Sequence, residues 1–297
     1  MAGLKLQQWI EPQSPDRRPP RAAYALPTMF TAGNIFLGFL SVMRTVQGAI
    51  LASAGAPGSE QHFAFAAATI GVAVLLDGLD GRIARMTNTT SDFGREMDSL
   101  ADVISFGIAP AVLAFAWGVQ SVDPAIGAGM REQVLRAGHF FAFLFLLCGS
   151  VRLARFNVQK NPVPKNPGRP HRKYFVGLPI PAGAAMVAAV VYASNSEPIT
   201  NWVLTVAWIA LLALLSFLMV STWRYYSFKD VSLLRPRSPL TVILLGVVIY
   251  LFWQYSQLGL LAMAVAYVGS GVVIRIGGIV RRLFRPSPPR PPEPTVA

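Results

Sequence analysis

Long apolar runs alternate with short polar stretches along most of the chain, and each run is close to the ~20 residues that cross a bilayer. Each run therefore predicts a membrane-spanning helix. The eight runs lie at residues 28–50, 62–84, 98–118, 134–156, 175–194, 200–222, 238–254 and 257–280. The pattern predicts an all-α integral membrane protein with eight transmembrane helices.

Proline-rich polar segments flank these runs, at residues 1–26 and 283–297. Segments of this composition bury too little apolar surface to form a core, so we expect them to be disordered or to lie on the lipid surface. No soluble catalytic domain is evident between the runs. Any chemistry must therefore be done by the membrane helices and their polar ends.

Composition supports a lipid bilayer as the surroundings of the chain. Hydrophobic residues make up 53% of it and charged residues only 13%, whereas about a quarter of the residues of a soluble protein are charged. The net charge of +12 does not indicate a nucleic-acid partner, because the basic residues are not clustered with aromatic residues on one soluble module. The single cysteine, Cys148, excludes a disulfide within the chain.

The positions of the basic residues predict the orientation. Most of the 26 lysines and arginines lie in segments that share one side if both termini are cytoplasmic, while the opposite loops GAPGSEQ, NSEPIT and WQYSQ contain none. Only Arg44, Arg131 and Arg136 fall elsewhere. Because basic loops stay in the cytoplasm, we expect both termini to be cytoplasmic and the protein to lie in the cell (inner) membrane.

Two pairs of aspartates mark the candidate site. Asp77 and Asp80 are three residues apart, and Asp98 and Asp102 are four apart, so each pair lies on one helix face. The second predicted helix ends, and the third begins, on the cytoplasmic side, so the pairs can converge there. Four close carboxylates repel one another unless a cation neutralises them. Mg²⁺ or Mn²⁺, which prefer oxygen ligands, would do so; ordinary interfacial charges are the alternative interpretation.

Small residues and one arginine separate the two pairs. Gly78, Gly81, Ala84 and Gly94 leave a surface without large side chains, which a bulky ligand could approach. Close helix packing is the alternative explanation for these glycines. Arg85 adds a cation able to bind a phosphate through two hydrogen bonds.

The order Asp77-x2-Asp80-Gly81-x2-Ala84-Arg85-x8-Gly94-x3-Asp98-x3-Asp102 resembles the signature of the CDP-alcohol phosphatidyltransferases at every position. The resemblance implies a six-helix core, a homodimer, a CDP-linked lipid donor and release of CMP. It also implies two divalent ions, Mg²⁺ or Mn²⁺, held by the four aspartates. Asp102 would be both a ligand and the catalytic base. The residues implied to bind the CDP-lipid within the signature are Gly81, Ala84, Arg85, Ser91 and Gly94.

Five further stretches resemble the serine O-phosphatidyltransferase branch of this family, at residues 27–39, 105–110, 152–157, 175–181 and 219–229. The resemblance implies CDP-diacylglycerol as the donor and L-serine as the acceptor. It places the core at residues 27–229, followed by two additional helices within 230–282. The same chemistry with glycerol 3-phosphate, inositol phosphate or choline, or with an archaeal-type lipid donor, remains the alternative.

Polar residues outside the signature supply further candidate contacts. Arg152 and Arg155 are one turn apart at the cytoplasmic end of the fourth predicted helix, where they could bind the carboxylate of serine or the lipid diphosphate; a role in membrane orientation is the alternative. Thr31 and Asn34 could bind the CDP-lipid. Ser105 and Asn157 could contact the acceptor. Hydrogen bonding between helices would explain these polar residues equally well.

A cation transporter is the competing function for the aspartates. Transport sites lie near the middle of the membrane, whereas these aspartates are predicted toward one face, beside Arg82 and Arg85. A fixed positive charge there disfavours the passage of cations. The sequence therefore favours the enzyme.

Overall fold

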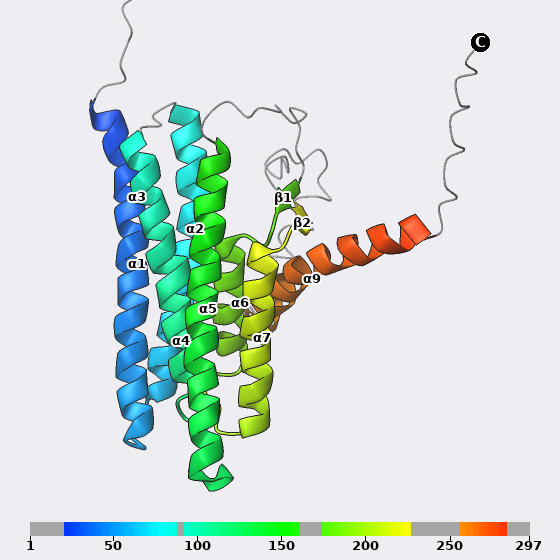
Figure 1. Cartoon of the computed structure of the whole chain (residues 1–297). Helices are drawn as coiled ribbons and strands as arrows, with labels where there is room; N and C mark the ends of the chain where they lie inside the picture. The colour runs from blue at the N-terminus through cyan, green and yellow to red at the C-terminus, as the bar shows by residue number, and fades with distance from the viewer. Residues whose placement is uncertain (1–20, 88–91, 161–173, 227–255, 284–297) are drawn as a thin grey trace, which may run out of the picture.

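The computed structural model of the chain describes residues 21–87, 92–160, 174–226 and 256–283. These residues form a helical bundle with one small sheet (Figure 1). The helices are α1 (Arg21–Ser53), α2 (Ser59–Thr87), α3 (Asp92–Asp102), the π-helix η1 (Val103–Ile108), α4 (Ala109–Gly118), the 3₁₀ turn η2 (Pro124–Ile126), α5 (Ala128–Lys160), α6 (Ile180–Ala193), α7 (Trp202–Val220) and α9 (Ser256–Leu283). The strands are β1 (Tyr174–Val176) and β2 (Arg224–Tyr226).

Six helical segments of the described residues are long and apolar enough to cross a membrane. They are residues 29–53, 59–79, 93–118, 128–158, 202–220 and 257–277. Helix α6 is apolar but has only 14 residues. The predicted all-helical membrane protein is thus confirmed in outline, while the predicted helix at 238–254 lies outside the described residues. The count of eight spans and the orientation of the termini stay predictions.

The helix expected at residues 175–194 is shorter than predicted, because its first residues form a strand. Strand β1 pairs antiparallel with β2, with Tyr174 opposite Tyr226. Gly177 then turns the chain with φ +78°, and its N–H donates to the carbonyl of Trp223 over 2.8 Å. Helix α6 starts only after Pro179, whose fixed φ suits the residue before a helix. A strand of three residues is too short to show a period of two in the sequence.

The third predicted helix is one continuous rod that contains a widened turn. It begins at Asp92 rather than at residue 98, and η1 separates α3 from α4. Pro110 explains the interruption, because proline has no N–H and its ring crowds the carbonyl four residues earlier, that of Phe106. A π-helical turn loosens the backbone at this point. Most of α4 is buried, so the rod runs through the centre of the bundle.

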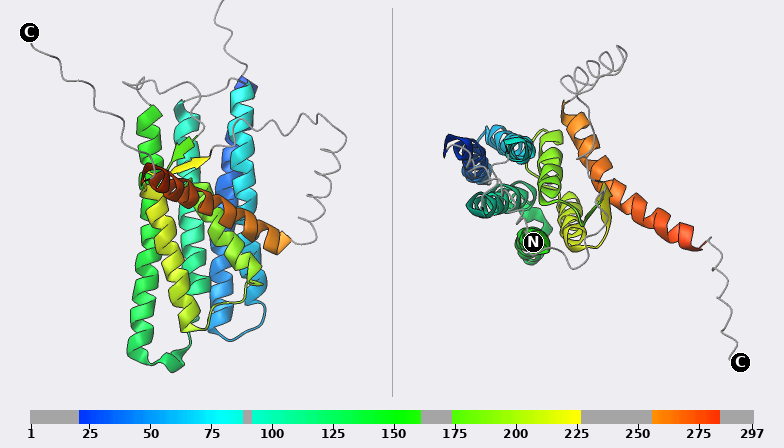
Figure 2. Two further views of the ribbon diagram at one scale, coloured as in Figure 1. Left: turned by 90° about the vertical axis from the view of Figure 1, so that its right-hand side faces the viewer. Right: turned by 90° about the horizontal axis from the view of Figure 1, so that it is seen from above.

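Helix α9 crosses the bundle obliquely instead of running beside it (Figures 1 and 2). The helix expected at 257–280 is therefore present, but not as a span parallel to the core. It packs against α6 and β2. The buried ring of Tyr225 fills the space beside Gly271, and its hydroxyl donates to the carbonyl of Val268 over 3.5 Å. Burial, reinforced by the nearby Tyr267, raises the pKa of Tyr225 to about 12, so this hydroxyl stays protonated.

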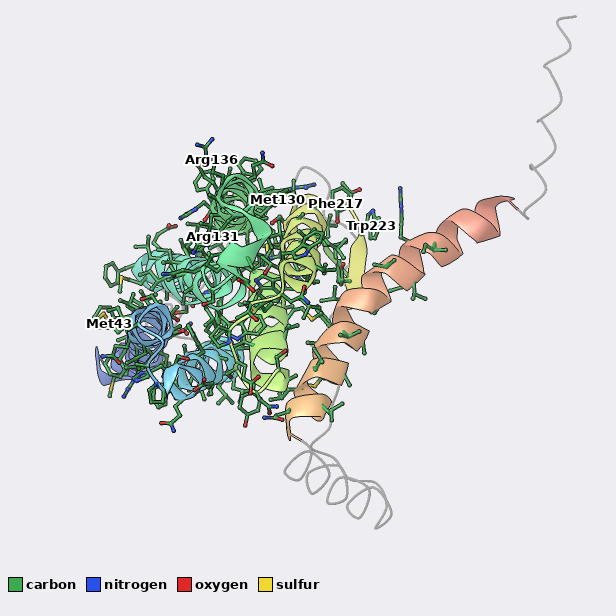
Figure 3. The ribbon with its side chains drawn as sticks, turned by 90° about the horizontal axis from the view of Figure 1, so that it is seen from below. Met43, Met130, Arg131, Arg136, Phe217 and Trp223 are labelled. Carbon is green, nitrogen blue, oxygen red and sulfur yellow. The ribbon has the colours of Figure 1, made fainter. Side chains whose placement is uncertain are left out.

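Short connections gather at the end of the bundle seen from below in Figure 3. The three basic residues that depart from the predicted charge pattern each have a local partner. The guanidinium of Arg44 lies 4.8 Å from the ring centroid of Phe65. Arg131 donates to the carbonyl of Val122 over 3.2 Å, and Arg136 pairs with Glu132 on the same helix. Local contacts therefore account for these charges.

Candidate active site

Three of the four predicted aspartates come together in the half of the bundle where α2 ends and α3 begins. Asp77 lies on α2, and Asp98 and Asp102 lie on α3. One carboxylate oxygen from each residue lies within 4.8 Å of the other two. Asp80 lies one turn beyond Asp77 on α2, and its side chain is outside the described residues. The structure thus brings together every one of these carboxylates that it describes.

The helices explain why these side chains meet. Helix α2 approaches the end of the bundle from which α3 departs (Figure 1). Asp98 and Asp102 are four residues apart on α3 and so share a face. Asp102 is the last residue of α3 and is only 9% exposed. The cluster therefore reaches from half-buried positions on α2 and α3 into the bundle.

The donor set suits a hard divalent cation. Carboxylate oxygens are the ligands that Mg²⁺ prefers, at about 2.0–2.1 Å. Two oxygens on opposite sides of one such ion are therefore about 4 Å apart, close to the spread of the three oxygens found here. Carboxylates held this close in a partly buried place favour a cation that offsets their repulsion. The residues present thus fit a divalent metal.

Arg152 of α5 faces this cluster. Its guanidinium interacts electrostatically with Asp102 and with Tyr267 of α9. Its Nε is buried, and within the described part of the chain it has no hydrogen-bond partner. Arg155, one turn further along α5, is exposed. The two arginines predicted to act together thus differ, and only Arg152 is turned toward the aspartates.

Tyr267 was not among the residues that the sequence singled out. It lies more than a hundred residues beyond the signature, and no spacing relates it to Arg152. Its ring is held beside the ring of Tyr225, with centroids 5.9 Å apart. In a sequence, an aromatic residue in an apolar run is typical of the core or of the membrane interface, so it gives no signal of a functional site. Only the oblique path of α9 reveals its proximity to the site.

Two of the predicted acceptor contacts make hydrogen bonds between helices. Ser105 is fully buried, and its Oγ donates to the carbonyl of Asn34 over 2.8 Å, joining η1 to α1. The Asn157 side chain donates to the Oγ of Ser99 over 2.7 Å, joining α5 to α3. These bonds correspond to the structural alternative considered from the sequence. Roles in acceptor binding stay predictions.

The residues predicted to bind the CDP-lipid are only partly described. Thr31 and Asn34 are buried on α1, and among the described residues no group bonds to the Asn34 Oδ1. Gly94 is half-buried on α3. Three more residues belong to the helical backbone of α2, with side chains outside the described part, namely Gly81, Ala84 and Arg85. Ser91 lies outside the described residues altogether.

Comparisons with known proteins agree with the family resemblance found in the sequence. The family model described as CDP-alcohol phosphatidyltransferase matches residues 24–215. The chain is 37% identical over 213 residues to the CDP-diacylglycerol–serine O-phosphatidyltransferase of Helicobacter pylori, covering 72% of this chain and 76% of that protein. It is 30% identical over 208 residues to the Bacillus subtilis protein of the same name, covering 69% and 91%. It is also 34% identical over 167 residues to the archaetidylserine synthase of Methanothermobacter thermautotrophicus, covering 56% and 57%.

Proposed function

Because the chain belongs to the CDP-alcohol phosphatidyltransferase family, we propose that it transfers the phosphatidyl group of CDP-diacylglycerol to L-serine and releases CMP. The observation that carries this proposal is the convergence of Asp77, Asp98 and Asp102 from two helices. The choice of serine is supported by relatives named for that reaction. An archaeal-type lipid donor, which the name of another relative suggests, remains the alternative.

We assign the binding of two divalent ions, Mg²⁺ or Mn²⁺, to Asp77, Asp80, Asp98 and Asp102. When bound, such ions would neutralise the charge of the diphosphate and make its phosphorus more electrophilic. The four aspartates would hold the ions, whose positive charge would offset the negative charge of the carboxylates. Contacts to the CDP-lipid are assigned to Gly81, Ala84, Arg85, Ser91, Gly94, Thr31 and Asn34.

Asp102 is proposed as the general base. It takes the proton of the acceptor hydroxyl while the hydroxyl oxygen forms a bond to the phosphorus of the phosphatidyl group. The bond from this phosphorus to the bridging oxygen breaks, and CMP leaves with that oxygen. Burial of Asp102 supports this role, because a carboxylate shielded from bulk water holds a fixed position relative to the phosphorus.

Arg152 is proposed to bind the carboxylate of serine. A guanidinium and a carboxylate form a charge-assisted pair, often with two parallel hydrogen bonds. The guanidinium lies near Asp102, so a serine bound there would present its hydroxyl close to the proposed base. Arg155, Ser105 and Asn157 are the further proposed acceptor contacts. The six apolar helical segments support a bilayer as the site of the reaction; the inner membrane, a cytoplasmic active site and a homodimer are part of the proposal.

Release of CMP from CDP-diacylglycerol tests the acceptor directly. Purified protein in detergent is incubated with CDP-diacylglycerol, Mn²⁺ and one of L-serine, glycerol 3-phosphate, inositol phosphate or choline. Among these four alcohols, we expect only L-serine to give CMP release well above background. The lipid product should then carry a primary amine. Release with glycerol 3-phosphate but not with serine would reject serine while retaining the reaction class.

Removal of metal tests the role of the aspartates. We expect a chelator to abolish CMP release and added Mg²⁺ or Mn²⁺ to restore it, because three clustered carboxylates otherwise repel the diphosphate. The measurement is the rate of CMP release as each metal is titrated back into chelated protein. An unchanged rate after exhaustive chelation would contradict the metal site.

A further inference from the structure

The π-helical turn that follows Asp102 is seated against α1 at an unusually close approach. Asp102 is the residue from which η1 starts, so the position of its backbone depends on how this turn is held. Helix α1 packs along α3, η1 and α4 in succession, and Figure 1 shows α1 beside this rod. The contact between α1 and η1 is therefore adjacent to the proposed base.

Gly38 makes this approach possible. A Cβ at position 38 would lie 2.6 Å from the Oγ and 2.8 Å from the Cα of Ser105. Real Cβ atoms essentially never approach other atoms so closely, and a backbone Cα cannot rotate away as a side chain can. Any larger residue would therefore push η1 away from α1.

Ser105 fixes the same contact with a directional bond. Its Oγ donates to the carbonyl of Asn34, one turn before Gly38 on α1, over 2.8 Å. Ser105 is fully buried, so this bond is not exchanged with water. Gly38 sets the distance between the two backbones, and the hydrogen bond sets how η1 is turned relative to α1.

The widened turn itself changes the direction of side chains on the rod. A π-helical turn holds more residues than an α-helical turn, so it rotates the positions after it relative to those before it. In this rod the turn allows Asp98 and Asp102 to face the site while Phe106 and Leu113 are buried in the core. The register of η1 thus determines where the aspartate face of α3 points.

We infer that Gly38 and Ser105 are positioning residues, which hold η1 against α1 and thereby place Asp102 relative to Asp77 and Asp98. Gly38 has no side chain that could contact substrate, and the positioning role of Ser105 is separate from the acceptor contact proposed above. Their effect on turnover rests on the proposed function, whereas their effect on the aspartate cluster does not. The two effects are therefore measured separately.

The principal variant is Gly38→Ala, with Gly33→Ala as the matched control. Both residues lie on α1, but a Cβ at Gly33 meets no atom within 4 Å. Binding of Mn²⁺ alone is measured by electron paramagnetic resonance, and kcat and KM are measured from CMP release. In Gly38→Ala we expect Mn²⁺ affinity and kcat each to fall on the order of 10-fold, because displacement of reacting groups by a fraction of an ångström is costly. The KM for CDP-diacylglycerol should stay near the wild-type value.

A second glycine separates positioning from general loss of stability. A Cβ at Gly48, also on α1, would lie 3.1 Å from the ring of Phe63, far from the aspartates. Gly48→Ala should lower the melting temperature but keep wild-type Mn²⁺ affinity and kcat. The inference is overturned if Gly48→Ala impairs both as strongly as Gly38→Ala does. It is also overturned if Gly38→Ala binds Mn²⁺ and turns over like the wild type.

Ser105→Ala keeps the inference testable if Gly38→Ala does not fold. It removes the hydroxyl that bonds to Asn34 without adding bulk. Its matched control is Ser216→Ala, which removes a buried hydroxyl that donates to the Leu212 carbonyl on the same helix α7. We expect weaker Mn²⁺ binding and a lower kcat in Ser105→Ala alone. A rise in the KM for serine with unchanged Mn²⁺ binding would make Ser105 an acceptor contact and overturn its positioning role.

Mn²⁺ binding also distinguishes this inference from the proposed function. If wild-type protein binds Mn²⁺ but releases no CMP with any alcohol, the proposed function fails. Weakened Mn²⁺ binding in Gly38→Ala would still support the positioning of the aspartates in that case.

Discussion

The aspartates of the site differ in how deeply their side chains are buried. Asp102 lies at the inner end of the cluster and is nearly buried, whereas Asp77 and Asp98 are half-buried. A buried base interacts more strongly with a developing charge, since less water screens it. The roles proposed for the aspartates therefore agree with their depth in the bundle as well as with their order in the signature.

Asp102→Asn is expected to lower kcat by about 10²–10⁴-fold, the usual contribution of a general base. Binding of CDP-diacylglycerol should be largely retained, because the asparagine still offers one oxygen to the metal. The measurement compares single-turnover CMP release with binding of the lipid substrate. Asp123→Asn is the matched control, because Asp123 accepts a hydrogen bond from the Ala125 N–H, outside the aspartate cluster. Equal losses of binding and turnover would make Asp102 a ligand only.

Arg152→Ala is expected to raise the KM for serine about 10-fold or more, since a hydrogen bond to a charged group contributes about 1.5–3 kcal/mol. The KM for CDP-diacylglycerol should change little. Arg155→Ala should raise the KM for serine less, because Arg155 is exposed. Steady-state kinetics with each substrate varied in turn provides the measurement. Unchanged serine kinetics in both variants would assign the arginines to orientation or stability.

Among the described helices, α9 differs from the rest because all of it lies beyond the residues matched by the family model. It is attached through Tyr225, which is completely buried against Gly271. It also carries Tyr267 toward Arg152. Helix α9 thus links the far end of the sequence to the proposed acceptor site.

Gly271→Ala is expected to destabilise the protein by about 1–3 kcal/mol, the usual cost of overpacking, because the completely buried ring of Tyr225 would have to shift. Gly269→Ala is the matched control. It lies on the same helix, and a Cβ there meets no atom within 4 Å. That control should be neutral or slightly stabilising, because alanine favours helix more than glycine does. Thermal unfolding in detergent compares the two variants, and equal stabilities would argue against this attachment of α9.

The elements also show which features can be predicted from a sequence. Helices were foreseeable, because apolar runs of bilayer length leave few alternatives, and the aspartate pairs followed from helical spacing. The π-helical turn was not foreseen, although Gly107 and Pro110 inside an apolar run signal a break. Strand β1 and the proximity of Tyr267 to Arg152 depend on residues distant in sequence, for which spacing gives no signal.

The whole molecule is strongly asymmetric along its long axis. The clustered aspartates lie near one end, whereas the short connections between helices lie at the other (Figure 1). The sequence predicts that the basic loops lie on the same side of the membrane as the aspartates. This asymmetry predicts that the end nearer the aspartates faces the cytoplasm.

Labelling of single cysteines tests this orientation. Cys148 is the only cysteine, so Cys148→Ser gives a background without thiols. Ala54→Cys at the connection between α1 and α2, and Val158→Cys near the end of α5, are exposed positions at opposite ends. An impermeant maleimide should label position 54 from the periplasmic side and position 158 from the cytoplasmic side only. Reversed labelling would place the aspartates outside the cell.

The one-sided position of the aspartates has a consequence for the membrane itself. Donor lipid, serine and CMP would all be handled at one end of the bundle, and none of them needs to cross the protein. Every new anionic headgroup would therefore enter a single leaflet. Each transfer would convert one lipid of that leaflet into another, so the new headgroups would collect in that leaflet and not in its opposite. Their appearance in the opposite leaflet would then depend on a separate activity that moves lipids across the bilayer.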